Sequence, residues 1–356
     1  MRAWEANIRR AVPYVPGEQP KGENLIKLNT NENPYPPAPE VEQALREMDY
    51  DRLRKYPDPE AAELRDCLAD YYGVGRDQVF VGVGSDDVLA MAFLTFFHSA
   101  KPILFPDVSY SFYKVWADLF GIAYETPELD EDFCIRPEDY YRDNGGIVFP
   151  NPNAPTGLLM PLSQVEDILF HNPDVIVLVD EAYIDFGGQS ALKLLDRYEN
   201  LLVVQTFSKA RSMAGMRIGF AIGSPLLIQA LNDVKYSYNS YTMNLPSLVL
   251  GAAAVRNERY FRETLKKITD TREWAKKCFH KLGFSFPDSM ANFIFVTHEE
   301  VPAKLIYEAL RKEQIYVRYF NQKRLRNYLR ITVGTKEEME ALFAFLREYL
   351  ASQERS

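Results

Sequence analysis

Residues 175–217 read VIVLVDEAYIDFGGQSALKLLDRYENLLVVQTFSKARSMAGMR and contain two apolar runs that predict buried strands. The runs at 175–180 and 201–207 are rich in valine and leucine. Such runs are typical of strands that are covered on both faces, as in parallel sheets. Polar residues stand where the strands end, Asp180 in the first run and Lys209 shortly after the second. We therefore expect strands of a parallel sheet that carry functional groups at their carboxyl ends.

Strand-like and helix-like patterns alternate on both sides of this stretch, from about residue 60 to residue 260. Short apolar runs separated by amphipathic helical patterns predict crossover units and a mostly parallel sheet with helices on both faces. The pairs that show the alternation are VFVGVG (79–84) before SDDVLAMAFLTFF, ILF (103–105) before YSFYKVWADLF, and IVF (147–149) before PLSQVEDILF. The predicted fold class of this part is α/β.

The rest of the chain predicts a smaller unit and an extended start. The last hundred residues alternate apolar runs and helical patterns in the manner of a small α+β domain, and 247–282 reads as a long helical connector. The first forty residues are rich in Pro, Asn and Gly, which excludes a continuous helix. Because single cores stop growing at roughly 250–300 residues, we expect an N-terminal arm (1–30), a large domain (31–260) and a small C-terminal domain (261–356).

The composition excludes several classes of protein. The 356 residues carry a formal net charge of -9, which argues against nucleic acid or an anionic membrane as the main partner. Three cysteines lie far apart without a CxxC pair, and four histidines are scattered, so no metal site is expected. No signal peptide or membrane-span pattern stands out. We expect a cytoplasmic protein.

Three predicted strand ends carry polar residues that are weak signals singly. They are GVGSDD (82–87), VDEAY (179–183) and TFSKARSMAGMR (206–217). A Gly-Ser turn before a helix occurs both in phosphate sites and in plain turns, an Asp at a strand end is more often a cap, and a lysine is usually solvated. In open α/β sheets, however, ligands bind beyond the carboxyl ends of the strands, so the three motifs are expected to meet.

Together these motifs meet the chemical needs of pyridoxal 5′-phosphate. The Lys209 amine can form a Schiff base with the cofactor's aldehyde, and the Asp180 carboxylate can keep the pyridine nitrogen protonated. The start of the helix at Ser85, with Arg217, can hold the dianionic phosphate. The carboxylate of Asp86 would repel a phosphate, so we expect backbone N–H groups to be the donors there and the acidic side chains to cap the helix or face away.

The whole chain resembles the fold-type I aminotransferases that depend on pyridoxal phosphate, and among them the histidinol-phosphate aminotransferases. The motifs that carry the resemblance, in the family's order and spacing, are LNTNENPYPP (28–37), RKYPDP (54–59), NPNAPTG (151–157), VDEAYIDF (179–186), SKARSMAGMRIGF (208–220) and LRITVGT (329–335).

This resemblance implies roles for the residues around the cofactor. Lys209 forms the internal aldimine, Asp180 pairs with the pyridine nitrogen, Tyr183 reaches the phenolic oxygen and Tyr110 stacks on the ring. The implied phosphate ligands are Ser85, Asp86, Thr206, Ser208 and Arg217. Tyr56 reaches the phosphate from the neighbouring subunit, which implies a homodimer.

The resemblance also implies substrate ligands and a reaction. Arg330 grips the acidic group of the substrate, while Arg318 and Tyr14 help to hold a substrate phosphate. The implied reaction transfers the amino group of L-histidinol phosphate to a 2-oxo acid such as 2-oxoglutarate, in histidine biosynthesis. An aromatic or broad-specificity aminotransferase, a threonine-phosphate decarboxylase on the same scaffold, and a catalytically silent binding protein are the alternatives that the sequence leaves open.

One position departs from the family pattern. The family usually has an asparagine directly before Pro-Thr-Gly that donates to the cofactor's phenolic oxygen, and this chain has Ala154 there. Asn153 lies one residue earlier, and adjacent residues of an extended segment point in opposite directions. We keep Asn153 as a candidate ligand that requires the loop to rotate, and otherwise Tyr183 alone would stabilise that oxygen.

Overall fold

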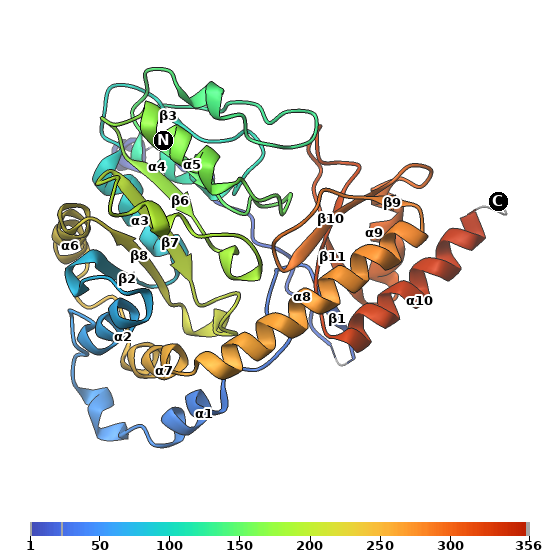
Figure 1. The fold of residues 1–356 in the computed structure, drawn as a ribbon, viewed down its shortest axis with the longest axis horizontal. Coiled ribbons are helices and arrows are strands. Elements are labelled where there is room, and N and C mark those ends of the chain that lie inside the picture. The colour runs from blue at the N-terminus through green and yellow to red at the C-terminus, as the bar shows by residue number, and fades with distance from the viewer. Residues whose placement is uncertain (1, 23, 354–356) are drawn as a thin grey trace.

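The computed structural model of the protein describes residues 2–22 and 24–353, which form two sheets with helices packed around them (Figure 1). The larger sheet has seven strands in the order β2-β8-β7-β6-β5-β3-β4. Only β8 runs antiparallel to its neighbours, β2 and β7, and the other pairs are parallel. The strands are β2 (Val79–Gly82), β3 (Ile103–Leu104), β4 (Tyr124–Glu125), β5 (Ile147–Pro150), β6 (Val177–Asp180), β7 (Leu201–Thr206) and β8 (Gly219–Gly223). The predicted α/β class with a mostly parallel sheet is confirmed.

Helices cover both faces of this sheet, and its central strands β5, β6 and β7 are buried at every position, with polar residues of β6 and β7 only at their carboxyl ends. Leu178 and Leu202 pack on one side, among the buried residues of α3, α4 and α6. Their neighbours Val177 and Leu201 pack on the other side, against α5, and α1, α2 and α7 cover the β2–β8 end of that side. The helices are α1 (Pro39–Arg46), α2 (Ala62–Tyr72), α3 (Ser85–Phe96), α4 (Phe112–Phe120), α5 (Leu162–His171), α6 (Pro225–Tyr238) and α7 (Leu245–Arg256).

The second sheet has five strands in the order β1-β11-β12-β10-β9 and packs against α8, α9 and α10. Its edge strand β1 pairs in parallel with β11, so a segment from the beginning of the chain completes a sheet made otherwise of its last quarter. The elements are β1 (Ile26–Leu28), α8 (Glu258–Lys281), β9 (Phe284–Ser285), β10 (Phe293–His298), α9 (Ala303–Lys312), β11 (Ile315–Tyr319), β12 (Leu329–Thr332) and α10 (Lys336–Gln353). The division into domains at residues 30 and 260 stays a prediction.

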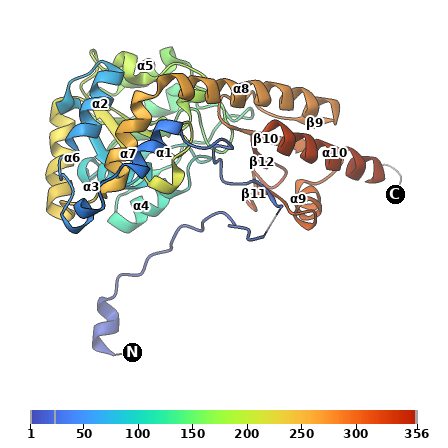
Figure 2. The same cartoon turned by 90° about the horizontal axis from the view of Figure 1, so that it is seen from below.

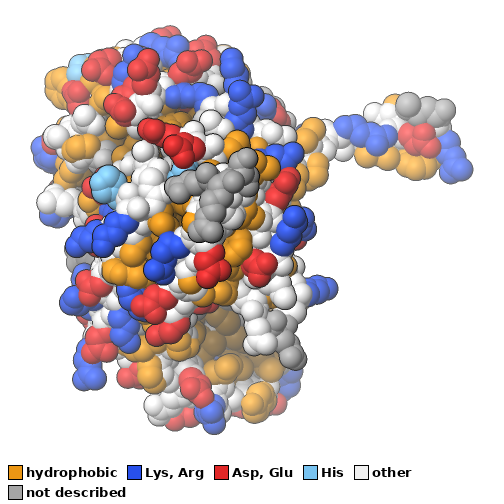
Figure 3. Space-filling model, turned by 90° about the vertical axis from the view of Figure 1, so that its right-hand side faces the viewer, with side chains coloured by type: hydrophobic (Ala, Val, Ile, Leu, Met, Phe, Trp, Pro, Cys, Tyr) orange, Lys and Arg blue, Asp and Glu red, His pale blue; other side chains and the backbone are white. Residues whose placement is uncertain are grey.

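The start of the chain extends away from both sheets. Figure 2 shows the segment around the 3-10 helix Ala3–Asn7 projecting from the body, and Figure 3 shows it standing out from a face where side chains of both charges are interspersed. Trp4, Val12 and Val15 on this segment are exposed. Among the helices that the structure describes, none combines the length and the apolar character needed to cross a bilayer.

The buried guanidinium of Arg272, on α8, connects a segment that follows the first sheet's β6 with a segment that precedes the second sheet's β10. Its Nη1 donates to the carbonyl of Phe186, which follows β6, and to the carbonyl of Ala291, which precedes β10, at 3.0 Å each. The residue is 5% exposed, so both carbonyls depend on this donor rather than on water.

We therefore expect Arg272→Ala to lower the free energy of unfolding by about 2–4 kcal/mol, since it leaves two buried carbonyls unpaired. Urea denaturation followed by tryptophan fluorescence measures the loss. Arg259→Ala is the matched control on the same helix, because the Arg259 side chain is 90% exposed and its ion pair should contribute below about 1 kcal/mol. Equal losses in the two variants would contradict this account of Arg272.

Candidate active site

A cavity of about 250 Å³ lies where the carboxyl ends of β6 and β7 face the second sheet. It collects most of the residues that the sequence singled out, although they come from segments far apart in the chain. The predicted site residues that line it are Tyr14, Ser85, Asp86, Tyr110, Asp180, Tyr183, Thr206, Ser208, Lys209, Arg217, Arg318 and Arg330. The structure thus brings together twelve of the fourteen predicted residues.

Lys209 projects into this cavity just beyond the end of β7. Its Nζ donates to the carbonyl oxygen of Thr30 at 3.0 Å and lies 5.8 Å from the centre of the Tyr183 ring. Burial lowers the pKa of the Lys209 amine to about 8, and the positive charge of Arg330 acts in the same direction. A sizeable fraction of the amine is therefore neutral near neutral pH, which is the form that attacks a carbonyl carbon.

Asp180, the last residue of β6, is 4% exposed, and its hydrogen-bond donors among the described residues are neutral. Its Oδ2 accepts a hydrogen bond from the Tyr113 hydroxyl at 2.8 Å, and its Oδ1 accepts one from the Ala182 backbone at 3.2 Å. Burial raises the pKa of the carboxyl to about 6, although the Tyr113 hydroxyl partly opposes this. Within residues 2–22 and 24–353, no lysine, arginine or histidine forms an ion pair with Asp180, so this carboxylate is suited to a ligand with a positive charge.

The N-terminus of α3 and Arg217 provide donors for an anion. Gly84, the residue before α3, has a φ of 84°, and a Cβ there would lie 2.5 Å from Nη2 of Arg217. Gly219 at the start of β8 comes equally close, since its Cβ would lie 2.3 Å from the backbone nitrogen of Ser85. The glycines therefore let the guanidinium and the free amides of a helix start approach one point, an arrangement that binds phosphate groups. The Thr206 and Ser208 hydroxyls, 3.0 Å apart, line the same end.

The two acidic residues at the start of α3 behave differently from each other. Asp87 faces away, as expected, and accepts a hydrogen bond from the backbone of Val83 at 2.9 Å. Asp86 instead lines the cavity, where its carboxylate accepts from the Tyr110 hydroxyl at 2.7 Å and from Nη2 of Arg217 at 3.2 Å. The expectation that both carboxylates turn away was wrong for Asp86, because a tyrosine and an arginine donor hold it inside.

These groups fit pyridoxal phosphate at three points. The neutral amine of Lys209 matches the aldehyde, and the unpaired buried carboxylate of Asp180 matches a protonated pyridine nitrogen. The helix start beside Arg217 matches the phosphate. At Asp180 the cofactor would supply the cationic partner that the described chain lacks. The Lys209 amine and Arg217 would exchange their present partners, the Thr30 carbonyl and Asp86, for the cofactor.

Two guanidinium groups form the other end of the cavity. Arg330 on β12 lies opposite Arg318 on β11 in the antiparallel register. Nη2 of Arg330 donates to the carbonyl of Asn29 at 3.2 Å, while its buried Nε has no hydrogen-bond partner in the part of the chain that the structure describes. Burial lowers the pKa of Arg330, and the charge of Arg318 adds to this effect. Since neither arginine forms an ion pair with any described residue, this end is ready to bind an anion, and Tyr14, stacked on Phe112 at 4.2 Å, borders it.

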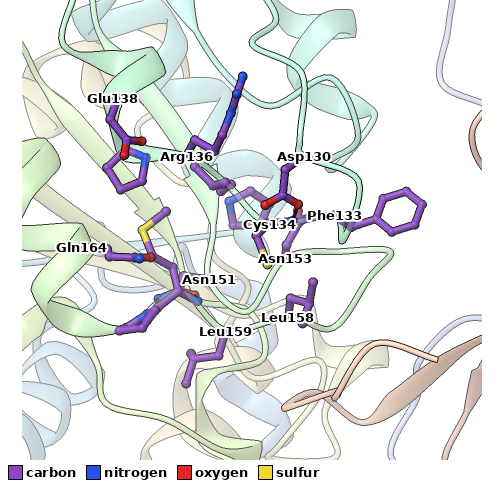
Figure 4. A pocket seen from close by; sticks show the side chains of 15 residues that line it. Asp130, Phe133, Cys134, Arg136, Glu138, Asn151, Asn153, Leu158, Leu159 and Gln164 are labelled. Carbon is purple, nitrogen blue, oxygen red and sulfur yellow. Dashed lines mark hydrogen bonds between the residues drawn. The ribbon is translucent and has the colours of Figure 1, made fainter.

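Two predicted residues lie outside the cavity. Tyr56 is 81% exposed and stacks on Tyr241 at 4.5 Å, so its role as a phosphate ligand requires a second subunit. Asn153 is buried in the wall of a neighbouring cavity of about 310 Å³, beside Cys134 and Leu158 (Figure 4). Its Nδ2 donates to the Val108 carbonyl at 3.0 Å. The loop has not rotated, Ala154 lines the active-site cavity in its place, and the structure gives no support to Asn153 as a cofactor ligand.

Sequence reasoning missed two residues that hold the predicted ones. Asn31 donates from Nδ2 to the Tyr183 hydroxyl at 2.9 Å, and Tyr113 donates to Asp180. Asn31 belongs to LNTNENPYPP, one of the motifs that carry the family resemblance. Tyr113 lies three residues after Tyr110, which was predicted as a cofactor ligand. The motif alone does not tell which of its several asparagines turns inward.

Comparison with known proteins places this geometry in a family. Residues 23–346 match the family model described as aminotransferase class I and II. The chain is 49% identical over 354 residues to a histidinol-phosphate aminotransferase of Lactococcus lactis subsp. cremoris, covering 99% of each protein. It is 52% identical over 350 residues to a histidinol-phosphate aminotransferase 1 of Hydrogenovibrio crunogenus, covering 98% of each.

A solved structure shows the same fold. The histidinol-phosphate aminotransferase of Sinorhizobium meliloti in complex with pyridoxal-5′-phosphate matches this chain with a TM-score of 0.85. The match covers 92% of this chain and 91% of that one, at 24% sequence identity. From the family model and the two relatives of about half identity, the chain belongs to the class I and II aminotransferase family.

Proposed function

We propose that this chain uses pyridoxal phosphate to transfer the amino group of L-histidinol phosphate to 2-oxoglutarate, a step of histidine biosynthesis. The observation that carries the proposal is one cavity that holds the Lys209 amine, the Asp180 carboxylate without a cationic partner, and two guanidinium groups that form no ion pair with a described residue. The names of relatives at about half identity over nearly the whole chain support the choice of substrate.

When bound, the cofactor supplies an electron sink that stabilises negative charge at the carbon bearing the amino group. Lys209 would hold it covalently, and the Asp180 carboxylate, by pairing with the ring nitrogen, would keep that nitrogen protonated. The pairing would also relieve the burial that raises the Asp180 pKa. Once the substrate amine has displaced it, the Lys209 amine is the base in the cavity that can remove the proton from the substrate and return it at the neighbouring carbon.

The arginine pair explains how one cavity can serve two substrates in turn. Arg330 and Arg318 face each other across β12 and β11 without an acidic partner in the described chain. Guanidinium groups bind phosphate and carboxylate oxygens with the same planar fork. The phosphate of the amino donor and a carboxylate of the 2-oxo acid would therefore use the same arginines, with Tyr14 closing that end.

We propose a homodimer as the working form. Tyr56 and Tyr241 present an exposed aromatic stack, and Trp4 and Val12 on the projecting N-terminal segment are exposed as well. A second subunit would cover these apolar groups and bring Tyr56 to the partner's phosphate site. A net charge of -9 argues against nucleic acid or an anionic membrane as the main partner, and the arginine pair would make the cavity locally positive for a small anionic substrate.

Borohydride reduction of the cofactor-loaded protein should attach the cofactor to Lys209, because reduction fixes the bond between its carbon and the lysine nitrogen. Peptide mapping by mass spectrometry identifies the labelled lysine. Lys235 and Lys276 are internal controls, since they are buried at 4% and 7% exposure but do not line the cavity. Label on any lysine other than Lys209 would overturn the site.

The rate of cofactor attachment to the cofactor-free protein should rise with pH and level off above about pH 8. The reason is that the neutral amine reacts, and the lowered pKa of Lys209, about 8, makes the neutral form predominant above that pH. Stopped-flow absorbance between pH 6.5 and 10 measures this rate. A rate that keeps rising about tenfold per pH unit up to pH 10 would show an ordinary lysine instead.

Arg318→Met and Arg330→Met should each raise the KM for histidinol phosphate about 10–100-fold, the loss expected for a charge-assisted hydrogen bond. With histidinol, which lacks the phosphate, the same variants should change the KM much less. Arg326→Met is the matched control, because Arg326 is exposed and does not line the cavity.

The same assay tests the rival reactions. The unchanged protein is given histidinol phosphate, phenylalanine and threonine phosphate as amines, with 2-oxoglutarate present and CO₂ release monitored. A preference for phenylalanine, or CO₂ release from threonine phosphate, would refute histidinol phosphate as the substrate. A protein that binds no cofactor under any of these conditions would refute the enzyme itself.

A further inference from the structure

Asn31 is a buried residue that connects the second sheet with the Tyr183 hydroxyl. It lies three residues beyond β1, is 1% exposed and has a φ of 56°, a left-handed conformation that asparagine and aspartate tolerate better than most residues. Its Nδ2 donates a hydrogen bond to the Tyr183 Oη at 2.9 Å. Asn31 also lines the active-site cavity, yet the residue roles implied by the family resemblance do not include it.

The hydrogen bonds around Asn31 fix which way its amide points. The Thr332 hydroxyl accepts from the Asn31 backbone N–H at 3.0 Å and donates to Asn31 Oδ1 at 3.2 Å. Because the carbonyl end of the amide is thus occupied by Thr332, the NH₂ end must face Tyr183. Asn292 adds a third constraint by donating to the Asn31 carbonyl at 3.0 Å.

This orientation of the Asn31 amide determines in which direction the Tyr183 hydroxyl can donate its hydrogen bond. An oxygen that accepts from Asn31 has its O–H directed elsewhere, and no acceptor for that proton lies among residues 2–22 and 24–353 of the described structure. Burial raises the pKa of Tyr183, so the hydroxyl stays protonated. Tyr183 therefore offers an unused O–H donor to the cavity that it lines.

The residues before Pro-Thr-Gly leave Tyr183 as an important donor. Ala154 lines the cavity without a polar side chain, and Asn153 is turned into the neighbouring cavity with its Nδ2 bonded to Val108. The segment before Pro-Thr-Gly thus contributes no side-chain donor. With the cofactor bound through Lys209, Tyr183 would then be the candidate side-chain donor to its phenolic oxygen.

We propose that Asn31 is a positioning residue that aims the Tyr183 O–H at the phenolic oxygen of the cofactor and so replaces the donor lost at Ala154. The inference rests on the proposed attachment of the cofactor to Lys209. Asn31 would also connect the cofactor end of the cavity with its arginine end, because Thr332, which orients Asn31, lies two residues from Arg330 on β12.

Asn31→Asp tests the proposal because it turns the donor into an acceptor. It changes the size and the backbone preference of the residue very little. The aspartate would take the Tyr183 proton for itself, and the phenolic oxygen would lose its donor. That oxygen would then hold more strongly the proton that it shares with the Lys209 nitrogen. The pH midpoint of the bound cofactor's visible absorbance should rise by about one unit, the shift expected for one hydrogen bond to a charged oxygen.

Two controls distinguish the loss of the Tyr183 hydrogen bond from a general electrostatic effect of the new negative charge. Asn24→Asp makes the same change at an exposed residue with a φ of 61°, and should leave the midpoint unchanged. Tyr183→Phe alone should raise the midpoint, and adding Asn31→Asp to it should then cause no further rise. Equal shifts with and without the tyrosine, or no shift in either, would overturn the proposal.

A second pair of variants covers the case in which Asn31→Asp does not fold. Thr332→Val removes the hydroxyl that orients Asn31 and should raise the midpoint, whereas Thr332→Ser keeps the hydroxyl and should not. Equal midpoints for these two variants would overturn the proposal. A failure of the proposed cofactor site is distinguishable, because it would show as a missing visible band in the unchanged protein, while a failure of the Asn31 proposal leaves the band present and its midpoint unmoved.

Discussion

The site depends on a carboxylate that is buried without a positive partner in the described chain. Asp180 occupies its position because β6 pairs along its whole length with β5 and β7, so the last residue of the strand reaches the edge of the sheet. An unpaired buried carboxylate costs several kcal/mol, which hydrogen bonds from Tyr113 and Ala182 offset only in part. A cationic ring nitrogen would offset the rest. The fold therefore contains one half of an ion pair, and the requirement for a cationic ligand follows from it.

The second constraint is the short segment 29–33, which links the two sheets. It leaves β1 in the second sheet and passes directly under the cavity, where it contacts all three kinds of functional group. Its backbone accepts hydrogen bonds from the Lys209 amine and from Arg330, and its side chains donate to Tyr183. One segment thus supports the amine, the anion-binding arginine and the tyrosine. A displacement of β1, which has only three residues, against its sheet would therefore move all three together.

The sequence predicted the groups that stand at strand ends and missed the groups that cross between the sheets. Lys209, Asp180 and the start of α3 follow long apolar runs, so their meeting at one sheet edge could be predicted from strand composition. The role of β1 could not be predicted, because three residues within a proline-rich stretch show no periodicity. Asn153 was kept as a candidate ligand although neighbouring residues of an extended segment point apart, and the structure places it in the wall of the other cavity instead. The position of Asp86 did not follow, since it depends on Tyr110 and Arg217, which lie far away in the sequence.

Asp86 raises the question of how a phosphate can enter a place where a carboxylate already sits. The ion pair between Asp86 and Arg217 is 3.2 Å long, and its side chains are 40% and 44% exposed. Such a half-exposed pair contributes at most about 1 kcal/mol. A dianionic phosphate would gain more, because it meets the free amides at the start of α3 as well as the guanidinium. The exchange therefore favours the phosphate, and Asp86, still bonded to the Tyr110 hydroxyl, can leave the arginine while keeping that tyrosine in place beside the cavity.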